Sequence, residues 1–299
     1  MSDSHYTRIG NNIVDVSTGE VVGQVDSRRG SPSGREEAGD TARKGLSACH
    51  NTRKSQKNGS VKLYVDGSLI KVTKNRTSIN NNNQEVTRGK IRGFSKKSRY
   101  RLLNRLAMIN KKDGFPLFIT LTYPSEFPTD RKIYKADLEK FIKRLIYRFP
   151  KVSGFWRLEF QKRGAPHYHL LVWGLPYSDE IKKYISKTWF KVVGSGDEKH
   201  LKAGTQVARV RSWRGVMFYA GKYMAKMDNI EFETGRVWGY FNAGYIPWSR
   251  VEVIKLSQKQ VVKLMRLMRR YARIKARDFP SLTIFINDPG QWMRAINTI

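Results

Sequence analysis

The chain has 299 residues, of which 57 are Lys or Arg and 25 are Asp or Glu, so its formal net charge is +32. A nucleic-acid-binding protein uses such an excess for phosphate contacts and steering, whereas an enzyme acting on small neutral substrates gains only self-repulsion. The single cysteine, Cys49, excludes an internal disulfide framework and any zinc site built from several thiolates. We therefore expect a nucleic-acid partner and a reducing, cytoplasmic location, with no membrane segment because no apolar run approaches the roughly 18 residues that span a bilayer.

The basic charge lies after the first fifty residues. Residues 1–50 hold 6 Lys and Arg against 7 Asp and Glu, and residues 51–299 hold 51 against 18, a net charge of +33. Residues 1–60 are rich in Gly, Ser, Asp and Glu without a sustained apolar period, which predicts a mostly disordered segment. In residues 61–94 we expect a small hairpin, with Asp66-Gly67 as a type I′ turn, followed by a polar linker.

Residues 95–256 have a regular apolar pattern that predicts one domain. Ser95 and Ser178 are placed as helix N-caps. The predicted elements are a helix from Ser95 that Gly114 stops, a strand over 115–123, a helix over 136–148, strands over 153–161 and 166–174, a helix from Ser178 to about Phe190, a strand over 206–212, a helix over 216–227 and a strand over 251–256. Ser257 then caps a long basic helix to about Arg277, within a C-terminal segment of residues 257–299. The alternation indicates an α+β fold with an antiparallel central sheet flanked by helices.

Two of the five histidines stand as His167-Tyr168-His169 in a predicted strand. Residues i and i+2 of a strand share a face, so both imidazoles project together. If Lys162-Arg163-Gly164 forms a three-residue hairpin loop with a left-handed glycine, Glu159 stands directly opposite His167. Two imidazoles and a carboxylate on one face suit Mg²⁺ or Mn²⁺ at a phosphodiester, with Zn²⁺ chemically possible and two ordinary sheet histidines as the alternative.

The second motif is a doubled Tyr-x-x-Lys over residues 219–226. Tyr219 and Tyr223 lie on one face of the predicted helix, and Lys222 and Lys226 form a neighbouring row. A Tyr hydroxyl attacks phosphorus only when a metal or cation stabilises the developing charge, a role that the lysines are spaced to fill. An amphipathic helix with buried tyrosines and solvated lysines is the structural alternative.

Three segments, in order, carry a family resemblance. Phe118-Ile-Thr-Leu-Thr-Tyr123, Gly164-Ala-Pro-His167-Tyr-His169 and the doubled Tyr-x-x-Lys resemble the three motifs of the HUH endonucleases, in particular the rolling-circle replication initiators of single-stranded DNA phages and related plasmids. The resemblance covers roughly residues 95–256 and implies an RRM-like, ferredoxin-like core. It implies that Glu159, His167 and His169 bind the metal, and that Thr120 and Thr122 lie on a strand beside the site.

The resemblance also implies the chemistry. Tyr219 and Tyr223 would take the nucleophile positions, with Lys222 and Lys226 orienting metal or phosphate, in a nicking and joining reaction at a single-stranded or hairpin origin through a 5′-phosphotyrosine. A host helicase and DNA polymerase would be partners, because no G-x-x-x-x-G-K-[ST] sequence is present. A transposase of the same superfamily and a non-catalytic nucleic-acid-binding protein remain the alternatives. The first would prefer transposon-end hairpins to an origin, and the second would be insensitive to EDTA and to tyrosine substitution.

Overall fold

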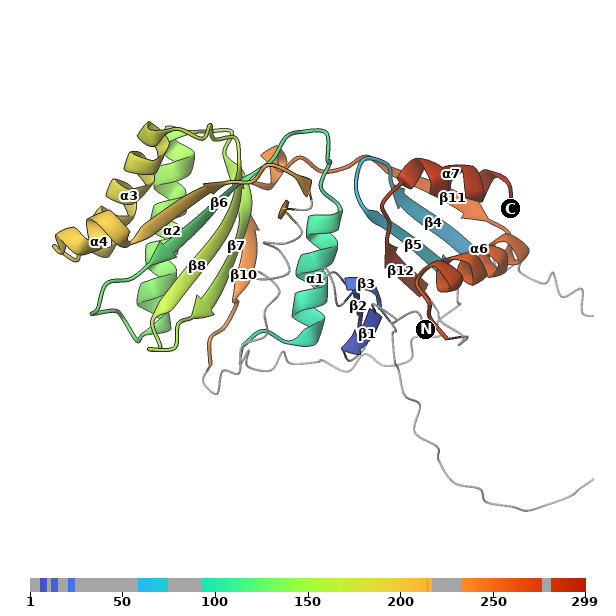
Figure 1. Cartoon of the computed structure of the whole chain (residues 1–299), viewed down its shortest axis with the longest axis horizontal. Helices are drawn as coiled ribbons and strands as arrows, with labels where there is room; N and C mark the ends of the chain where they lie inside the picture. Colours follow the sequence, from blue (N-terminus) through green and yellow to red (C-terminus); the bar gives the residue numbers. More distant parts are fainter. Residues whose placement is uncertain are drawn as a thin grey trace, which may run out of the picture.

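The computed structural model describes residues 59–74, 93–213, 215–216, 233–275 and 281–299, together with the backbone of three short strands between residues 6 and 24. The predicted helix over 216–227 lies outside the described residues from residue 217 onward, and with it Tyr219, Lys222, Tyr223 and Lys226. Within the described part, the chain forms two antiparallel sheets, each flanked by helices (Figure 1). The predicted α+β class is therefore confirmed.

The first lobe is built on a five-stranded sheet in the order β10-β7-β8-β6-β9. Its strands are β6 (Leu117–Thr122), β7 (Ser153–Phe160), β8 (Pro166–Trp173), β9 (Thr205–Arg209) and β10 (Trp238–Phe241). The helices α2 (Arg131–Arg148) and α3 (Asp179–Val193) cover one face, with α4 (Glu198–Ala203) beside α3, and α1 (Lys96–Ala107) lies on the other face (Figure 1). The Tyr168 hydroxyl donates to the Tyr134 carbonyl of α2 at 2.9 Å, which fixes the covered face as the one opposite to His167 and His169.

Local chemistry sets the helix ends. The side chains of Ser95 and Ser178 accept from the backbone amides of Ser98 and Ile181, as helix N-caps do, so both predicted caps are confirmed. Helix α2 begins at Arg131, five residues before its predicted start, because the Asp130 side chain caps it. Helix α1 ends at Ala107 and not at Gly114, since the next residues leave the helix and pair with residues 247–249.

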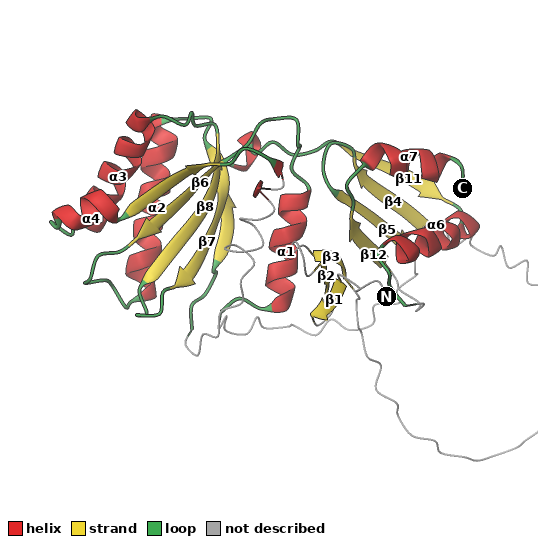
Figure 2. Ribbon diagram, viewed as in Figure 1, coloured by secondary structure: helices red, strands yellow, loops and turns green. Residues whose placement is uncertain are grey.

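The second lobe is built from both ends of the chain. Its seven-stranded sheet has the order β1-β2-β3-β12-β5-β4-β11. The strands are β1 (Tyr6–Ile9), β2 (Asn12–Asp15), β3 (Val21–Gln24), β4 (Gly59–Tyr64), β5 (Leu69–Lys74), β11 (Val251–Leu256) and β12 (Ser281–Phe285). The helices α6 (Gln258–Tyr271) and α7 (Pro289–Asn297) pack on one face of β4, β5, β11 and β12 (Figure 2).

The second lobe differs from the sequence predictions at three points. The strand over 251–256, predicted in the same domain as the histidines, pairs instead with β4 in a six-residue register from Val251↔Tyr64 to Leu256↔Gly59. The hairpin of residues 59–74 is confirmed, but its turn is not type I′: Asp66 and Gly67 have no positive φ, and Gly67 N–H donates to the Tyr64 carbonyl. Helix α6 ends at Tyr271, earlier than the predicted Arg277.

The two lobes have separate hydrophobic cores, and α1 lies between them. The first core holds the large buried side chains Tyr134, Phe141, Phe155, Tyr168 and Trp189, and the second holds Val61, Ile70, Leu264, Met268 and Ile284. None of the described helices combines the length and the apolar character needed to cross a bilayer.

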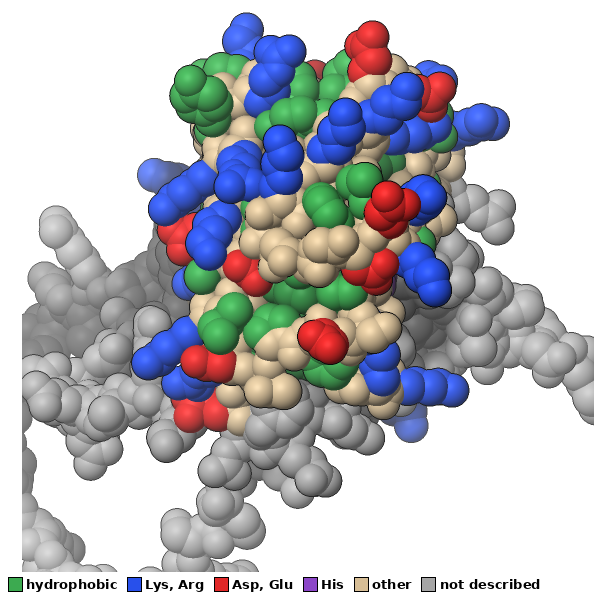
Figure 3. Space-filling model, turned by 90° about the vertical axis from the view of Figure 1, so that its left-hand side faces the viewer, with side chains coloured by type: hydrophobic (Ala, Val, Ile, Leu, Met, Phe, Trp, Pro, Cys, Tyr) green, Lys and Arg blue, Asp and Glu red, His purple; other side chains and the backbone are tan. Residues whose placement is uncertain are grey.

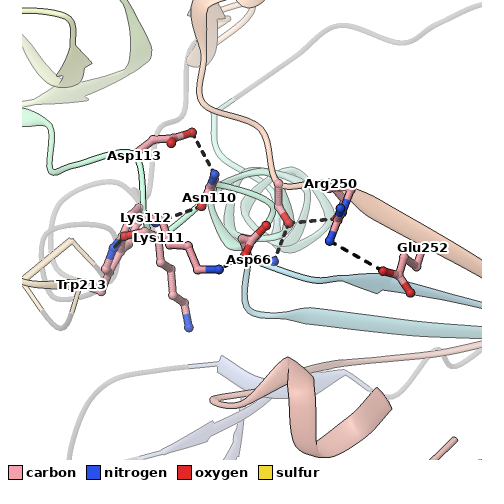
Figure 4. A network of polar contacts seen from close by, with 9 residues as sticks. Asp66, Asn110, Lys111, Lys112, Asp113, Trp213, Arg250 and Glu252 are labelled. Atoms are coloured by element: carbon pink, nitrogen blue, oxygen red, sulfur yellow. Dashed lines mark hydrogen bonds and ion pairs between the residues drawn. The ribbon is translucent and has the colours of Figure 1, made fainter. Parts of the chain in front are cut away.

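A polar network joins the lobes where the β4–β5 turn meets the end of α1 (Figure 4). The Asp66 carboxylate lies 2.7 Å from Lys112 Nζ, the Asp66 amide donates to Ser249 Oγ at 3.0 Å, and the Asp66 carbonyl accepts from the Lys111 amide. Trp213 Nε1 donates in turn to the Lys111 carbonyl. Residue 213 stands four residues before the undescribed segment 217–232, so the chain that leads to the two tyrosines is anchored at this junction.

Candidate active site on the β7–β8 hairpin

The hairpin that joins β7 to β8 has the register expected from the sequence. Gly164 has φ +83°, Gly164 N–H donates to the Gln161 carbonyl, and Gln161 N–H donates to the Ala165 carbonyl. The pairs that follow are Phe160↔Pro166 and Glu159↔His167. The left-handed glycine thus brings Glu159 opposite the first histidine, as predicted.

Glu159, His167 and His169 lie together on the face of the first sheet on which α1 lies, opposite to α2 and α3. The imidazole centroids of the two histidines are 4.6 Å apart, and Glu159 Oε2 lies 3.0 Å from His169 Nε2. Glu159 is 8% exposed and His169 is 3% exposed, whereas His167 is half-buried. The cluster therefore has a buried carboxylate–imidazole pair and one more accessible imidazole.

Thr122 on β6 fixes the accessible imidazole. Strand β6 pairs with β8 so that Thr120 stands opposite His169 and Thr122 opposite His167, which confirms that the threonine motif lies beside the cluster. Thr122 Oγ1 is 3.0 Å from His167 Nδ1. This hydrogen bond orients the ring of His167 through its Nδ1 atom.

The Thr122 backbone is itself held by two ring N–H groups. Its carbonyl accepts from Trp189 Nε1 at 2.8 Å and from His200 Nε2 at 2.9 Å. Burial lowers the pKa of His200 below its ordinary value of 6.5, which favours the neutral ring, and Ser195 Oγ completes its contacts at Nδ1. His200 has no role among the sequence predictions, and its only sequence signal is its rarity as one of five histidines.

Arg157 is the second residue that the sequence predictions missed. It is fully buried on β7, opposite His169 and Trp238, and on the same face as Glu159. Its guanidinium carbon lies 4.2 Å from the centroid of the Phe94 ring, and Nη1 donates to the Val237 carbonyl. Arg157 thus places a buried guanidinium on the same face of the sheet as the carboxylate–imidazole pair. The available signal was an arginine at an inward-facing position of a predicted strand, two residues before Glu159.

The donor types of the cluster are those that hold a divalent cation, two imidazole nitrogens and a carboxylate. Among the residues that the structure describes, however, no group of three or more His, Cys, Asp or Glu side chains is arranged as a metal-binding cluster. Glu159 instead contacts His169 directly at 3.0 Å. A cation bound by all three residues would have to replace that hydrogen bond.

Both ends of the segment that contains the two tyrosines are attached to the first lobe. Before it, Ser212 accepts from the amides of Gly215 and Val216, and Val216 is buried. After it, Glu233 forms an ion pair with Arg131, and the Val237 carbonyl accepts from the Leu158 amide, next to Glu159. Tyr219, Lys222, Tyr223 and Lys226 themselves lie outside the described residues.

Comparison with known proteins gives a family match. Residues 116–228 match the family model described as replication-associated protein ORF2. No curated protein and no solved structure matches the chain. The matched range runs from β6 to beyond β9, so it contains the Glu159–His169 cluster and the sequence positions of both tyrosines. The similarity of this range to replication-associated proteins supports a role in initiating replication, with DNA as the partner.

Proposed function

We propose that the protein is a rolling-circle replication initiator, an endonuclease and strand transferase that nicks single-stranded or hairpin origin DNA and later rejoins it. The observation that carries the proposal is the register Glu159↔His167 on the β7–β8 hairpin, within the range similar to replication-associated proteins. The net charge of +32 supplies affinity for the phosphate backbone. Separation of the strands falls to a host helicase and synthesis to a host polymerase.

The reaction that we propose is a transesterification. The Oη atom of Tyr219 or Tyr223 loses its proton and attacks the scissile phosphorus, the bond from phosphorus to the 3′ oxygen breaks, and that oxygen takes up a proton and leaves as a 3′-OH. The product is a 5′-phosphotyrosine, which conserves the energy of the ester, so neither cutting nor joining needs ATP. Attack by the second tyrosine on the regenerated origin, followed by attack of the released 3′-OH on the first ester, would yield a circle.

The chain's own groups divide the work as follows. Lys222 and Lys226 offset charge that develops on the attacked phosphate, and Thr122 keeps the His167 ring in place. Glu159, His167 and His169 would hold a Mg²⁺ or Mn²⁺, which would polarise the phosphate. The support for this cation is the shared face and mutual proximity of the three side chains.

The decisive experiment separates the two tyrosines. Tyr219→Phe, Tyr223→Phe and the double variant are incubated with circular single-stranded DNA and Mn²⁺, and covalent protein–DNA adducts are counted on a denaturing gel. We expect the double variant to form no adduct and EDTA to abolish the adduct of the wild type. Adduct formation by the double variant would contradict the phosphotyrosine mechanism, and full cutting and rejoining by either single variant would contradict the alternate use of both tyrosines.

A further inference from the structure

The four strands β11, β4, β5 and β12 have one face that α6 and α7 do not cover. On the covered face, Val61, Ile70 and Leu282 pack against the two helices. The opposite face presents three rows of side chains, set by the strand registers. From the β4–β5 turn outward, the rows are Val251–Tyr64–Leu69–Phe285, Val253–Lys62–Lys71–Thr283 and Lys255–Ser60–Thr73–Ser281.

In the row nearest the turn, Tyr64, Leu69 and Phe285 are covered by α1 and the first lobe, whereas Val251 is 40% exposed. Leu69 is buried and Phe285 packs against the first core. Burial raises the pKa of Tyr64, and the charge of Arg105 on α1 opposes that rise. The other two rows are open in the described structure, where Val253 is 57% exposed and Lys62, Lys71 and Lys255 are all exposed. We call the open surface that these two rows form, with its three lysines, the lysine face.

The lysine face carries positive charge without compensation from the described residues. None of the twelve positions on this side of the four strands is acidic, and no described Asp or Glu forms an ion pair with any of the three lysines. Lys62 stands directly opposite Lys71, an arrangement of like charges that is unfavourable in a sheet. A polyanion laid across the strands would relieve this repulsion and would gain the release of its counterions.

The lysine face is turned toward the same helix as the candidate active site. Ser98 of α1 accepts a hydrogen bond from Trp238, which shares the face of Arg157 and His169, and the Ala107 carbonyl of α1 accepts from the Ser68 amide at the β4–β5 turn. Figure 1 shows α1 between the two sheets. The candidate active site and the lysine face therefore lie on two sides of the same helix (Figure 1).

Two other basic surfaces in the described part of the chain lack this combination. The exposed side of α6, with Lys259, Lys263 and Arg266, lies on the far side of the second sheet because the other side of α6 packs on that sheet. On the face formed by α2, α3 and α4, acidic side chains are interspersed among the lysines and arginines (Figure 3). The lysine face is thus distinguished by position and by the lack of acidic neighbours on its strands, not by bulk charge.

We propose that the lysine face binds single-stranded DNA that enters or leaves the Glu159–His169 cluster, with Lys62, Lys71 and Lys255 contacting phosphates and Val251 and Val253 contacting bases. Exposed apolar side chains beside the lysines favour a single strand, since its bases are accessible and those of a duplex are stacked inside. The inference rests on the proposed function for the identity of the polyanion. It goes beyond that function because it assigns DNA binding to a surface outside residues 116–228.

The test compares two triple variants of the full chain with the same change in charge. In the first, Lys62, Lys71 and Lys255 are changed to Gln, and in the control the exposed α3 residues Lys183, Lys187 and Lys191 are changed to Gln. Equilibrium binding to a labelled oligothymidylate is measured by fluorescence anisotropy over a range of salt concentrations. Loss of three phosphate contacts at roughly 0.7 each should reduce the slope of log K against log salt by about 2 in the first variant, and the control should keep the wild-type slope.

The binding measurement tests the lysine face, and the nicking measurement tests the proposed function, so the two can fail separately. Equal slopes in the two triple variants, whether both are reduced or both are unchanged, would overturn the lysine face as a binding surface. If only the first triple variant has a reduced salt slope but the wild type never forms a covalent adduct, the proposed function fails while the lysine face stands. If adducts form and the first triple variant binds like the wild type, the lysine face fails while the proposed function stands. Thermal unfolding of both variants checks that these exposed substitutions leave the fold intact.

Discussion

At the scale of single residues, Thr122 connects the candidate active site to the rest of the first lobe. Its hydroxyl contacts His167, and its carbonyl is held by Trp189 and His200. The imidazole of His167 is thereby oriented by groups on three different elements, β6, α3 and α4. In metal sites, removal of a hydrogen-bond partner of a ligand imidazole typically lowers metal affinity or activity by about 10-fold to 100-fold, and this is the scale expected if the proposed role of His167 holds.

We therefore expect Thr122→Val to lower the nicking rate by about 10-fold to 100-fold, because valine has a similar shape but cannot bond His167 Nδ1. Thr122→Ser keeps the hydroxyl and should restore most of the activity. Both variants should unfold near the wild-type temperature, as followed by circular dichroism. Equal activity of the valine and serine variants would mean that the hydrogen bond has no part in the reaction.

At the scale of elements, the β7–β8 hairpin was predictable from the sequence in register as well as in position. A short polar loop with one glycine between two apolar runs determines which residues face each other, so the pair Glu159↔His167 followed from local rules. The burial of Arg157 could not be predicted in this way, because it depends on Phe94 and Val237, which are distant in sequence. The contact of His200 with Thr122 could not be predicted for the same reason.

The sequence predictions missed several elements of the structure. They are β1, β2, β3, α4, β10, β12 and α7. Strands β10 and β12 have four and five residues, too few for a clear period, and each pairs with a strand far away in the chain. The strand over 251–256 was predicted, but its pairing with β4 was not, because an apolar pattern indicates a strand without indicating which strand lies beside it. The tyrosine helix stays a prediction.

Gly164 gives a prediction at this scale. Its φ of +83° is costly for any residue with a Cβ, yet an added Cβ would have no atom within 4 Å. Gly164→Ala should therefore destabilise the first lobe by about 1 kcal/mol through backbone conformation alone, whereas Gly164→Asn should cost less. Urea unfolding measures both values. A larger loss in the asparagine variant than in the alanine variant would contradict the left-handed turn.

At the scale of the whole molecule, the two lobes have separate cores, and the chain crosses between them at α1 and at residues 247–250. Leu264 is fully buried in the second core, and Leu145 is fully buried in the first. Truncation of either leucine leaves a cavity that costs roughly 3–5 kcal/mol, with each cost falling on one core.

We expect Leu264→Ala and Leu145→Ala to lower the midpoint temperatures of two different unfolding transitions in differential scanning calorimetry. Leu264→Ala should melt the second lobe first and leave adduct formation measurable at lower temperature, whereas Leu145→Ala should affect the lobe that carries the cluster. A single transition that both substitutions shift equally would show instead that the network around Asp66 couples the lobes into one cooperative unit.

The pairing of β4 with β11 also imposes an order of events on the ribosome. Strand β4 is made early, but its partner begins at Val251, and the neighbour of β5 is complete only at Phe285. All strands of the first lobe have been synthesised once Phe241 is added. Since domains fold as units while the chain emerges, the lobe with the Glu159–His169 cluster can fold before the partners of β4 and β5 have been made. A nascent chain would thus have a folded cluster before it has a finished lysine face.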